Sequence, residues 1–241
     1  MIRFRYSRAG LVLFLLIIVT QRLVTGQPAA RDMAEDAHYH LLLENNAVRV
    51  FAVTIPPHQQ AYVAHERNFL TVTLQDSEVV IWRQGQSPVQ HFKAPKGEVR
   101  FFEGPGARGI RNDTSSEYRN VTVEFKDPRV TTYGYRPGTG KRGYGPTLLD
   151  RPVDPHGHFV NSLDLQHAVV NDVQLRTKDR LDAHQPSRPE LLIAVSAVDL
   201  ASQGRELQLD PGDIHWFESG RSGVENRGPA PARFVMVGIR P

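Results

Sequence analysis

Apolar and polar positions alternate along much of the chain from residue 44 onward. In FLTVTL, residues 69–74, the apolar residues Leu70, Val72 and Leu74 share one face of an extended chain, and Thr71 and Thr73 share the other. This two-residue period predicts half-buried β-strands. Further strands are expected in AVRVFAVTI, EVVIW, EVRFF, VVNDVQLRT, RELQL and GDIHWF, with turn residues between them. No long segment has the period of an amphipathic helix, so the pattern predicts an all-β protein.

NVTVEF, residues 120–125, repeats the alternation. Its two valines and Phe125 are expected to point inward and its polar positions outward; the polar positions are Asn120, Thr122 and Glu124. In contrast, ELLIAVSAVDL and RFVMVGI contain apolar residues at successive positions. Such runs suit strands that are covered on both faces.

The segment from Gly97 to Phe125 recurs in altered form from Gly212 to Ile239. Four residues return 115 positions later: Gly97, Glu98, Phe102 and Glu103 correspond to Gly212, Asp213, Phe217 and Glu218. Each copy then continues with a Gly-rich turn, an asparagine (Asn112 or Asn226) and a closing strand. The repeat predicts two β units of ordinary domain size in one chain.

The N-terminal residues differ from the rest of the chain. Residues 1–26 combine three early arginines, the apolar run LVLFLLIIV and a small-residue site ending in VTG, which predicts a signal peptide and an exported protein, periplasmic or extracellular. An uncleaved N-terminal anchor is the alternative. The expected organisation is a signal peptide (1–26), a lead-in (27–43), a first unit (44–126), a Gly/Pro/Tyr/Arg-rich linker (127–160) and a second unit (161–241).

Charge and cysteine content restrict the function further. Without residues 1–26 the chain has 25 basic and 26 acidic side chains, because four arginines lie in that segment. A nearly neutral chain gives no basis for a nucleic-acid partner, or for a membrane partner beyond the N-terminal segment. The chain has no cysteine, which excludes disulfides, thiolate catalysis and cysteine-ligated metals.

The order of strands, Pro-containing turn, His-containing segment, Gly-Glu or Gly-Asp turn and asparagine resembles the cupin family over residues 44–125 and 165–239. Two copies in one chain resemble a bicupin. The resemblance implies two jelly-roll (double-stranded β-helix) barrels, each with a site at its open end. In metal-dependent cupins the first motif supplies two histidines and a glutamate, and the second motif supplies a third histidine.

Few of these ligand positions are kept. In the first copy, His65 in VAHERN lies near the first-motif position, and Arg108 stands four residues before Asn112, where the family has a histidine. In the second copy, His184 and Glu190 match two ligands, and Pro186 and Ser222 stand at the other two positions. A metal site generally needs three or four converging ligands. No metal cofactor is therefore expected, with His184 and Glu190 as weak candidates for a divalent transition metal if His215 or His167 joins them.

Each candidate residue has two interpretations. His65 is a residual ligand or a polar residue at the mouth of the barrel, and His184 with Glu190 is a weak metal site or a hydrogen-bonded pair. Arg108 has no lone pair for a metal but five donors suited to a carboxylate or phosphate. Its alternative role is an ion pair with Glu103 or Glu66.

Two classes of function follow from these residues. The favoured one is an exported bicupin-like protein with degenerate metal sites that binds a small molecule, such as an anion, or has a structural role. Its candidate ligand-binding residues are Arg108, His65, Glu66, His184 and Glu190. The alternative is a cupin-type enzyme: a metal-dependent oxygenase, isomerase or decarboxylase, or a metal-free sugar-modifying enzyme that uses His and Tyr for acid–base chemistry. A small-molecule ligand is the expected partner, and a homodimer is compatible with either class.

Overall fold

The computed structural model describes residues 29–85, 90–132, 159–182, 188–218 and 223–240. These residues form β-strands joined by turns, with one short 3₁₀ helix, η1 (Met33–Glu35), and no α-helix among them. The prediction of an all-β jelly-roll protein is confirmed. The described part of the chain contains no helix with the length and hydropathy needed to cross a membrane.

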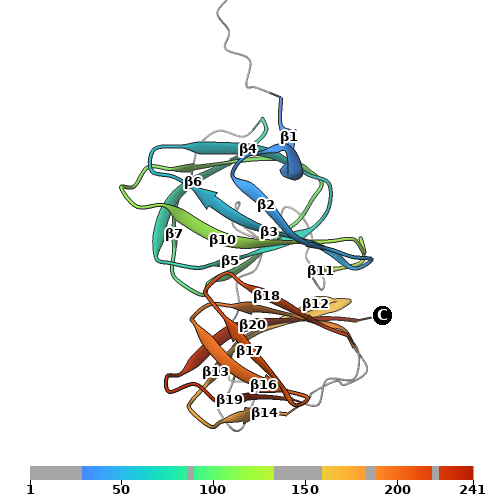
Figure 1. The fold of residues 1–241 in the computed structure, drawn as a ribbon. Coiled ribbons are helices and arrows are strands. Elements are labelled where there is room, and N and C mark those ends of the chain that lie inside the picture. Colours follow the sequence, from blue (N-terminus) through green and yellow to red (C-terminus); the bar gives the residue numbers. More distant parts are fainter. Residues whose placement is uncertain (1–28, 86–89, 133–158, 183–187, 219–222, 241) are drawn as a thin grey trace, which may run out of the picture.

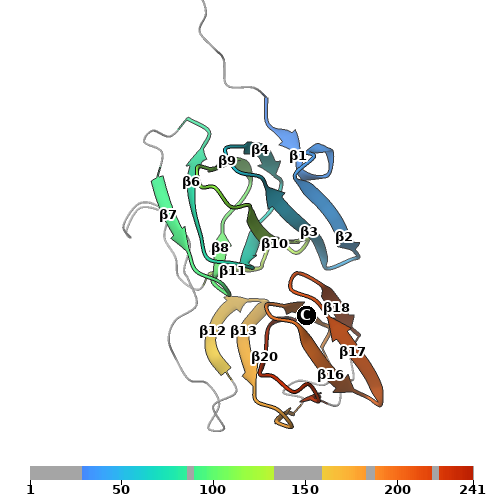
Figure 2. The same cartoon turned by 60° about the vertical axis from the view of Figure 1, so that its left-hand side comes forward.

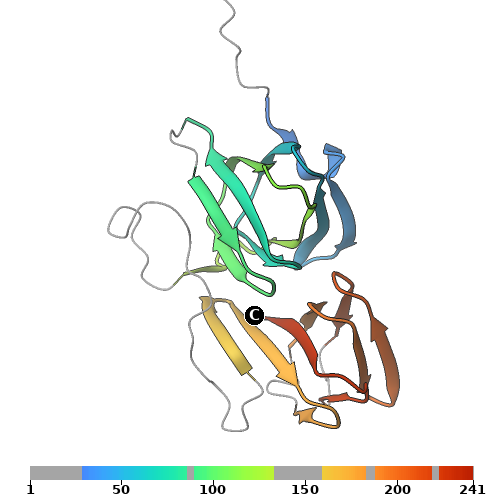
Figure 3. The same ribbon diagram turned by 90° about the vertical axis from the view of Figure 1, so that its left-hand side faces the viewer.

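Four sheets stack in two lobes, one above the other in Figure 1. The first lobe contains two five-stranded sheets. One has the order β1 (Arg31–Asp32), β4 (Gln60–His65), β9 (Gly106–Asn112), β6 (Ser77–Arg83), β7 (Gln90–Ala94). The other has the order β2 (Tyr39–Glu44), β3 (Val48–Ile55), β10 (Tyr118–Phe125), β5 (Phe69–Thr73), β8 (Val99–Phe102). Viewed as in Figure 3, these strands close into a ring.

The second lobe has a six-stranded and a four-stranded sheet. The larger has the order β11 (Thr131–Thr132), β12 (Phe159–Gln166), β13 (Ala168–Leu175), β20 (Ala232–Ile239), β15 (Glu190–Ala194), β18 (Ile214–Phe217). The smaller has the order β14 (Arg180–Leu181), β19 (Val224–Asn226), β16 (Val198–Ser202), β17 (Arg205–Leu209). Most of the expected linker, residues 133–158, and the whole expected signal peptide lie outside the described residues.

The repeat has a structural basis in two equivalent turns. Gly97 and Gly212 have φ angles of +83° and +100°, which glycine adopts at little cost, and their N–H groups donate to the carbonyls of Thr73 and Ala194. Asn112 and Asn226 are fully buried. Each asparagine Nδ2 donates to two main-chain carbonyls, one at the end of a neighbouring strand and one four residues ahead; the acceptors are Ile55 and Ser116 for Asn112, and Leu175 and Ala230 for Asn226.

The lobes share one apolar core. It lies between the sheet containing β10 and the sheet containing β20, which face each other in Figure 2. Val121, Val123 and Phe125 of β10 contribute to this core together with Val235 and Val237 of β20. The second lobe also has its own apolar interior, which includes Leu192, Ala194 and Phe234. Strands β15 and β20 are thus covered on both faces, as their apolar runs predict.

The orientation predicted for NVTVEF is wrong for its polar positions. Val121, Val123 and Phe125 are buried as expected, in the core that the first lobe shares with the second, whereas Asn120 and Thr122 face the interior of the first barrel. Asn120, Thr122 and Glu124 are only 3%, 2% and 1% exposed. The alternation itself is correct, but the polar face is directed at the interior of the barrel rather than at solvent.

Two further expectations differ from the structure. The Gly-rich stretch after Glu103 is largely strand β9 rather than a turn. Gly109 is required in this strand because a Cβ atom there would lie 1.9 Å from the ring of Trp82. The segment expected as a lead-in contributes three elements, β1, η1 and β2. Strand β1 pairs with β4, and β2 pairs with β3. Met33 of η1 is fully buried in the apolar cluster of the first lobe.

Candidate functional site: a cationic cavity in the first lobe

The inner face of the β10 sheet carries polar residues in rows set by strand register. Thr71 of β5 is paired with Arg100 of β8 on one side and with Thr122 of β10 on the other. The next row has Thr73 beside Asn120. Along these strands the valines alternate with the polar residues. The valines therefore lie in the apolar core shared by the two lobes, here called the interlobe core, and the polar side chains lie inside the barrel.

These residues line a cavity of about 50 Å³ between the two sheets of the first lobe. Its described lining combines aromatic, hydroxyl and cationic groups: Tyr39, His65, Phe69, Thr71, Thr73, Ile81, Phe92, Arg100, Phe102, Arg108, Gly109, Ile110, Tyr118, Asn120 and Thr122. Two of the sequence candidates, His65 and Arg108, are therefore brought together here.

His65, at the end of β4, is only 4% exposed. Its ring stacks on Phe69 with centroids 3.6 Å apart and planes within 6° of parallel. Burial, assisted by the positive charges of Arg108 and Arg49, lowers the pKa of the imidazole to about 3. The ring is therefore neutral at ordinary pH, and its buried Nδ1 has no hydrogen-bond partner among the described residues.

Arg108 lies in β9 and is 7% exposed. Its guanidinium carbon is 5.4 Å from the ring centre of Phe69 and 5.0 Å from that of Phe102. Its Nη2 donates a 2.7 Å hydrogen bond to the main-chain carbonyl of Glu103, so the contact with this glutamate involves the backbone. The side chain of Glu66 is exposed and is not part of the cavity lining.

Arg100 and Tyr118 were not identified from the sequence. Arg100 donates a 2.7 Å ion-paired hydrogen bond to Glu98, and its guanidinium carbon lies 3.2 Å from the ring centre of Phe92. Burial raises the pKa of the Tyr118 phenol to about 12, so it remains protonated at neutral pH. The signal for Arg100 was available: in EVRFF it alternates with Val99 and Phe101, which both enter the interlobe core.

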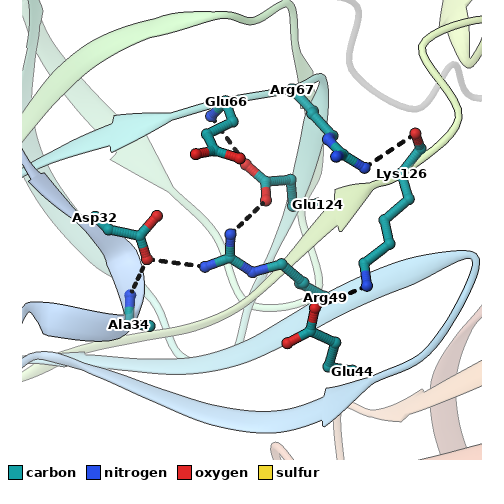
Figure 4. Close-up of polar contacts among 8 residues, drawn as sticks. All are labelled: Asp32, Ala34, Glu44, Arg49, Glu66, Arg67, Glu124 and Lys126. Carbon is teal, nitrogen blue, oxygen red and sulfur yellow. Dashed lines mark hydrogen bonds and ion pairs between the residues drawn. The ribbon is translucent and has the colours of Figure 1, made fainter.

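A charged cluster is linked to the cavity row that contains Phe69, because Glu124 pairs with Phe69 in the sheet. Figure 4 shows Arg49 between Asp32 and Glu124, with nitrogen–oxygen distances of 2.9 Å and 3.5 Å. Burial raises the pKa of Glu124, and Arg49 and the main-chain N–H of Glu66 offset this only in part. Through these ion pairs, Arg49 connects Asp32 of β1 to Glu124 of β10.

The second lobe offers less to a polar ligand. Glu190 begins β15, and His215 of β18 occupies a diagonal position on the same face, since Glu190 pairs with Phe217 and Leu192 with His215. The interior beside them is apolar. His184, Pro186 and Ser222 lie outside the described residues, and His167 stands in the turn between β12 and β13.

The cavity does not have the donor set of a metal-dependent cupin. Its described lining contains one imidazole, no carboxylate and two guanidinium groups. Across the described ranges, no cluster of three or more His, Cys, Asp or Glu side chains is arranged to hold a metal ion. Guanidinium groups cannot donate a lone pair, so these lining residues do not fit a transition-metal centre.

Comparison with known proteins shows which solved structures share this fold. No protein-family model and no curated protein sequence matches the chain. Among solved structures, AerE from Microcystis aeruginosa has a TM-score of 0.66 at 11% identity, over 86% of this chain and 95% of that one. Oxalate decarboxylase OxdC from Bacillus subtilis gives 0.58 at 12% identity, over 90% and 79%.

A third structure is the Cupin 2 conserved barrel domain protein from Leptotrichia buccalis. It has a TM-score of 0.52 at 9% identity, over 92% of this chain and 94% of that one. Identities this low carry information about fold and not about activity. The sheet order and these likenesses together show that the chain has the fold of the cupins.

Proposed function

We propose that the protein binds a small organic anion in the cavity of the first lobe, and that the second lobe is a scaffold. The observation that carries this proposal is the cavity lining, in which the charged side chains among the described residues are Arg100 and Arg108. A guanidinium in a low-dielectric site interacts strongly with a carboxylate and can bind it through two parallel hydrogen bonds. The pKa of His65 is lowered mainly by burial and further by the positive charge of Arg108, and the same positive charge would favour a bound anion.

Binding can be measured by calorimetry and by thermal melting with sodium acetate, sodium oxalate, sodium phosphate and sodium chloride. We expect a carboxylate to bind and to raise the melting temperature, and Arg108→Gln to abolish both effects. Arg111→Gln is the matched control, because Arg111 lies in the same strand but pairs with Asp113 at the surface. Equal binding by the Arg108→Gln protein, or no binding of any anion, would reject the proposal.

The proposal includes the absence of a catalytic metal. The support is the donor set of the cavity, which lacks converging imidazoles and carboxylates among the described residues. Elemental analysis of untagged protein never exposed to chelator should give far less than one transition-metal ion per chain. Stoichiometric metal that is lost in His65→Ala or in His184→Ala would assign a metal site to the corresponding lobe and favour the enzyme alternative.

We also propose that the protein is an exported bicupin. Its support is the leader-like composition of residues 1–26 and the two equivalent glycine and asparagine turns. N-terminal sequencing of protein from the native host should begin near Gln27. An intact Met1 in a soluble cytoplasmic fraction would contradict export.

A further inference from the structure

The cavity has two chemically different parts, one strand row apart. The first is formed by Arg108 and His65, next to Phe69. The second is the row containing Arg100, Thr71 and Thr122. Phe69 and Thr71 are two residues apart on β5, which corresponds to about 6.6 Å along the strand. A ligand that spans both parts must carry its anionic group and a second polar group close together.

The first part suits a carboxylate. Arg108 supplies charge-assisted N–H donors, and the neutral His65 ring supplies one further donor or acceptor. The Nδ1 atom of His65 is buried without a hydrogen-bond partner among the residues described, and buried polar atoms are generally satisfied. A carboxylate oxygen or its neighbouring hydroxyl would satisfy this atom.

The second part suits a hydroxyl group. Thr122 already donates a 2.8 Å hydrogen bond to Asn120. Thr71 is half-buried and lines the cavity, and its hydroxyl makes no hydrogen bond to another of the described residues. A threonine hydroxyl both donates and accepts, so it can pair with an alcohol in either direction.

The size of the cavity and its charges further restrict which ligands fit. A cavity of about 50 Å³ has room for about four water-sized groups, hence for an acid of about four to six non-hydrogen atoms. Arg100 is already ion-paired with Glu98 at 2.7 Å. A dianion would direct its second carboxylate at a guanidinium that has a carboxylate partner, so a monoanion fits better.

We infer that the ligand is a two- or three-carbon 2-hydroxy monocarboxylate, with its carboxylate held by Arg108 and His65 and its hydroxyl held by Thr71. Glycolate is the smallest member of this class. The inference rests on the proposed function, since it assigns a ligand class to the same cavity.

The test is calorimetric titration of the purified protein with sodium glycolate, sodium acetate and sodium oxalate. Acetate has the carboxylate without the hydroxyl, and oxalate has two carboxylates. We expect glycolate to bind about tenfold more tightly than acetate, because the Thr71 hydroxyl gains a partner only with glycolate. Thr71→Val should remove this preference, so that glycolate and acetate bind about equally.

Thr54→Val is the matched control, because Thr54 lies in β3 of the same sheet and does not line the cavity. It should keep the glycolate preference, and thermal melting verifies that each variant is folded. Equal binding of glycolate and acetate, tighter binding of oxalate, or an unchanged preference in Thr71→Val would each overturn the inference and leave anion binding intact. If no carboxylate binds in an Arg108-dependent way, the proposed function itself fails.

Discussion

His65 combines a titratable side chain with surroundings that oppose its protonation. The ring is buried against Phe69, and Arg108 and Arg49 add positive charge nearby. The pKa of the ring falls to about 3, against about 6.5 for a solvated histidine. A base whose pKa is lowered by folding binds fewer protons in the folded state, so its contribution to stability is present above pH 6.5 and is lost as the pH falls below it.

We therefore predict that His65→Phe makes the protein less sensitive to acid. Phenylalanine can keep the stacking on Phe69 but cannot take up a proton. Between pH 7.5 and pH 5 the wild-type protein should lose roughly 2 kcal/mol of unfolding free energy through this residue alone, from about 1.4 kcal/mol per pH unit below 6.5. The loss should be absent in the variant, as measured by urea unfolding at both pH values.

Glu124 acts in the opposite direction, because its pKa is raised and its protonation on acidification favours the folded state. Since Glu124 is present in both proteins, its contribution cancels in the difference between wild type and His65→Phe. If the difference in unfolding free energy between wild type and His65→Phe does not change with pH, the low pKa of His65 is contradicted.

At the same scale, sequence analysis identified His65 and Arg108 but missed Arg100, Thr71 and Tyr118. The first two stand at positions that a family motif marks. The others enter the cavity through strand register, which depends on pairing between segments far apart in the chain. Glu66 was a candidate ion-pair partner of Arg108, but the chain turns after β4 and its side chain is exposed.

At the scale of elements, β5, β8 and β10 have the alternation of strands with one face in solvent, yet both of their faces are covered. Their apolar face packs on the second lobe and their polar face lines the cavity. A polar lining and a solvated surface require the same residue types, so the pattern alone predicts the strands and not their orientation. Strand β9 was missed because its glycines resemble a turn, whereas Gly109 serves close packing.

We predict that Gly109→Ala destabilises the first lobe. The added Cβ would lie 1.9 Å from the ring of Trp82, which stacks on Tyr62 with centroids 6.4 Å apart. Displacing this ring should cost about 1–3 kcal/mol of unfolding free energy, as overpacking generally does. Urea unfolding of the variant measures the cost.

A double-mutant cycle separates this clash from other effects of the added methyl group. In a Trp82→Leu background the smaller side chain leaves room, so Gly109→Ala should cost much less than in the wild-type protein. The same cost in both backgrounds would show that the clash with Trp82 is not the cause.

At the scale of the molecule, the two lobes are joined by more than the chain connection. Their facing sheets form one apolar core, and Arg233 of the second lobe pairs with the buried Asp172 while its Nη1 donates to the carbonyl of Lys96 in the first. A Cβ on Gly97 would lie 2.3 Å from the Arg233 side chain, so the turn and the guanidinium are closely packed. The repeat predicts two β units, but the sequence does not show that their apolar faces meet.

We predict that the two lobes unfold together, and the chain's two tryptophans allow a direct test. Trp82 lies in the first lobe and Trp216 in the second, so Trp216→Phe and Trp82→Phe each leave a fluorescent reporter for one lobe. Leu200→Ala would be added to both proteins. Leu200 is fully buried in the second lobe's own interior, and its truncation should cost about 2–5 kcal/mol. Because exposing the shared core is unfavourable for either lobe alone, the urea midpoint should fall equally for both reporters.

A fall in the urea midpoint that is confined to the Trp216 reporter would contradict this prediction. It would mean that the first lobe remains folded without its neighbour, and that the contact between the lobes contributes little to its stability.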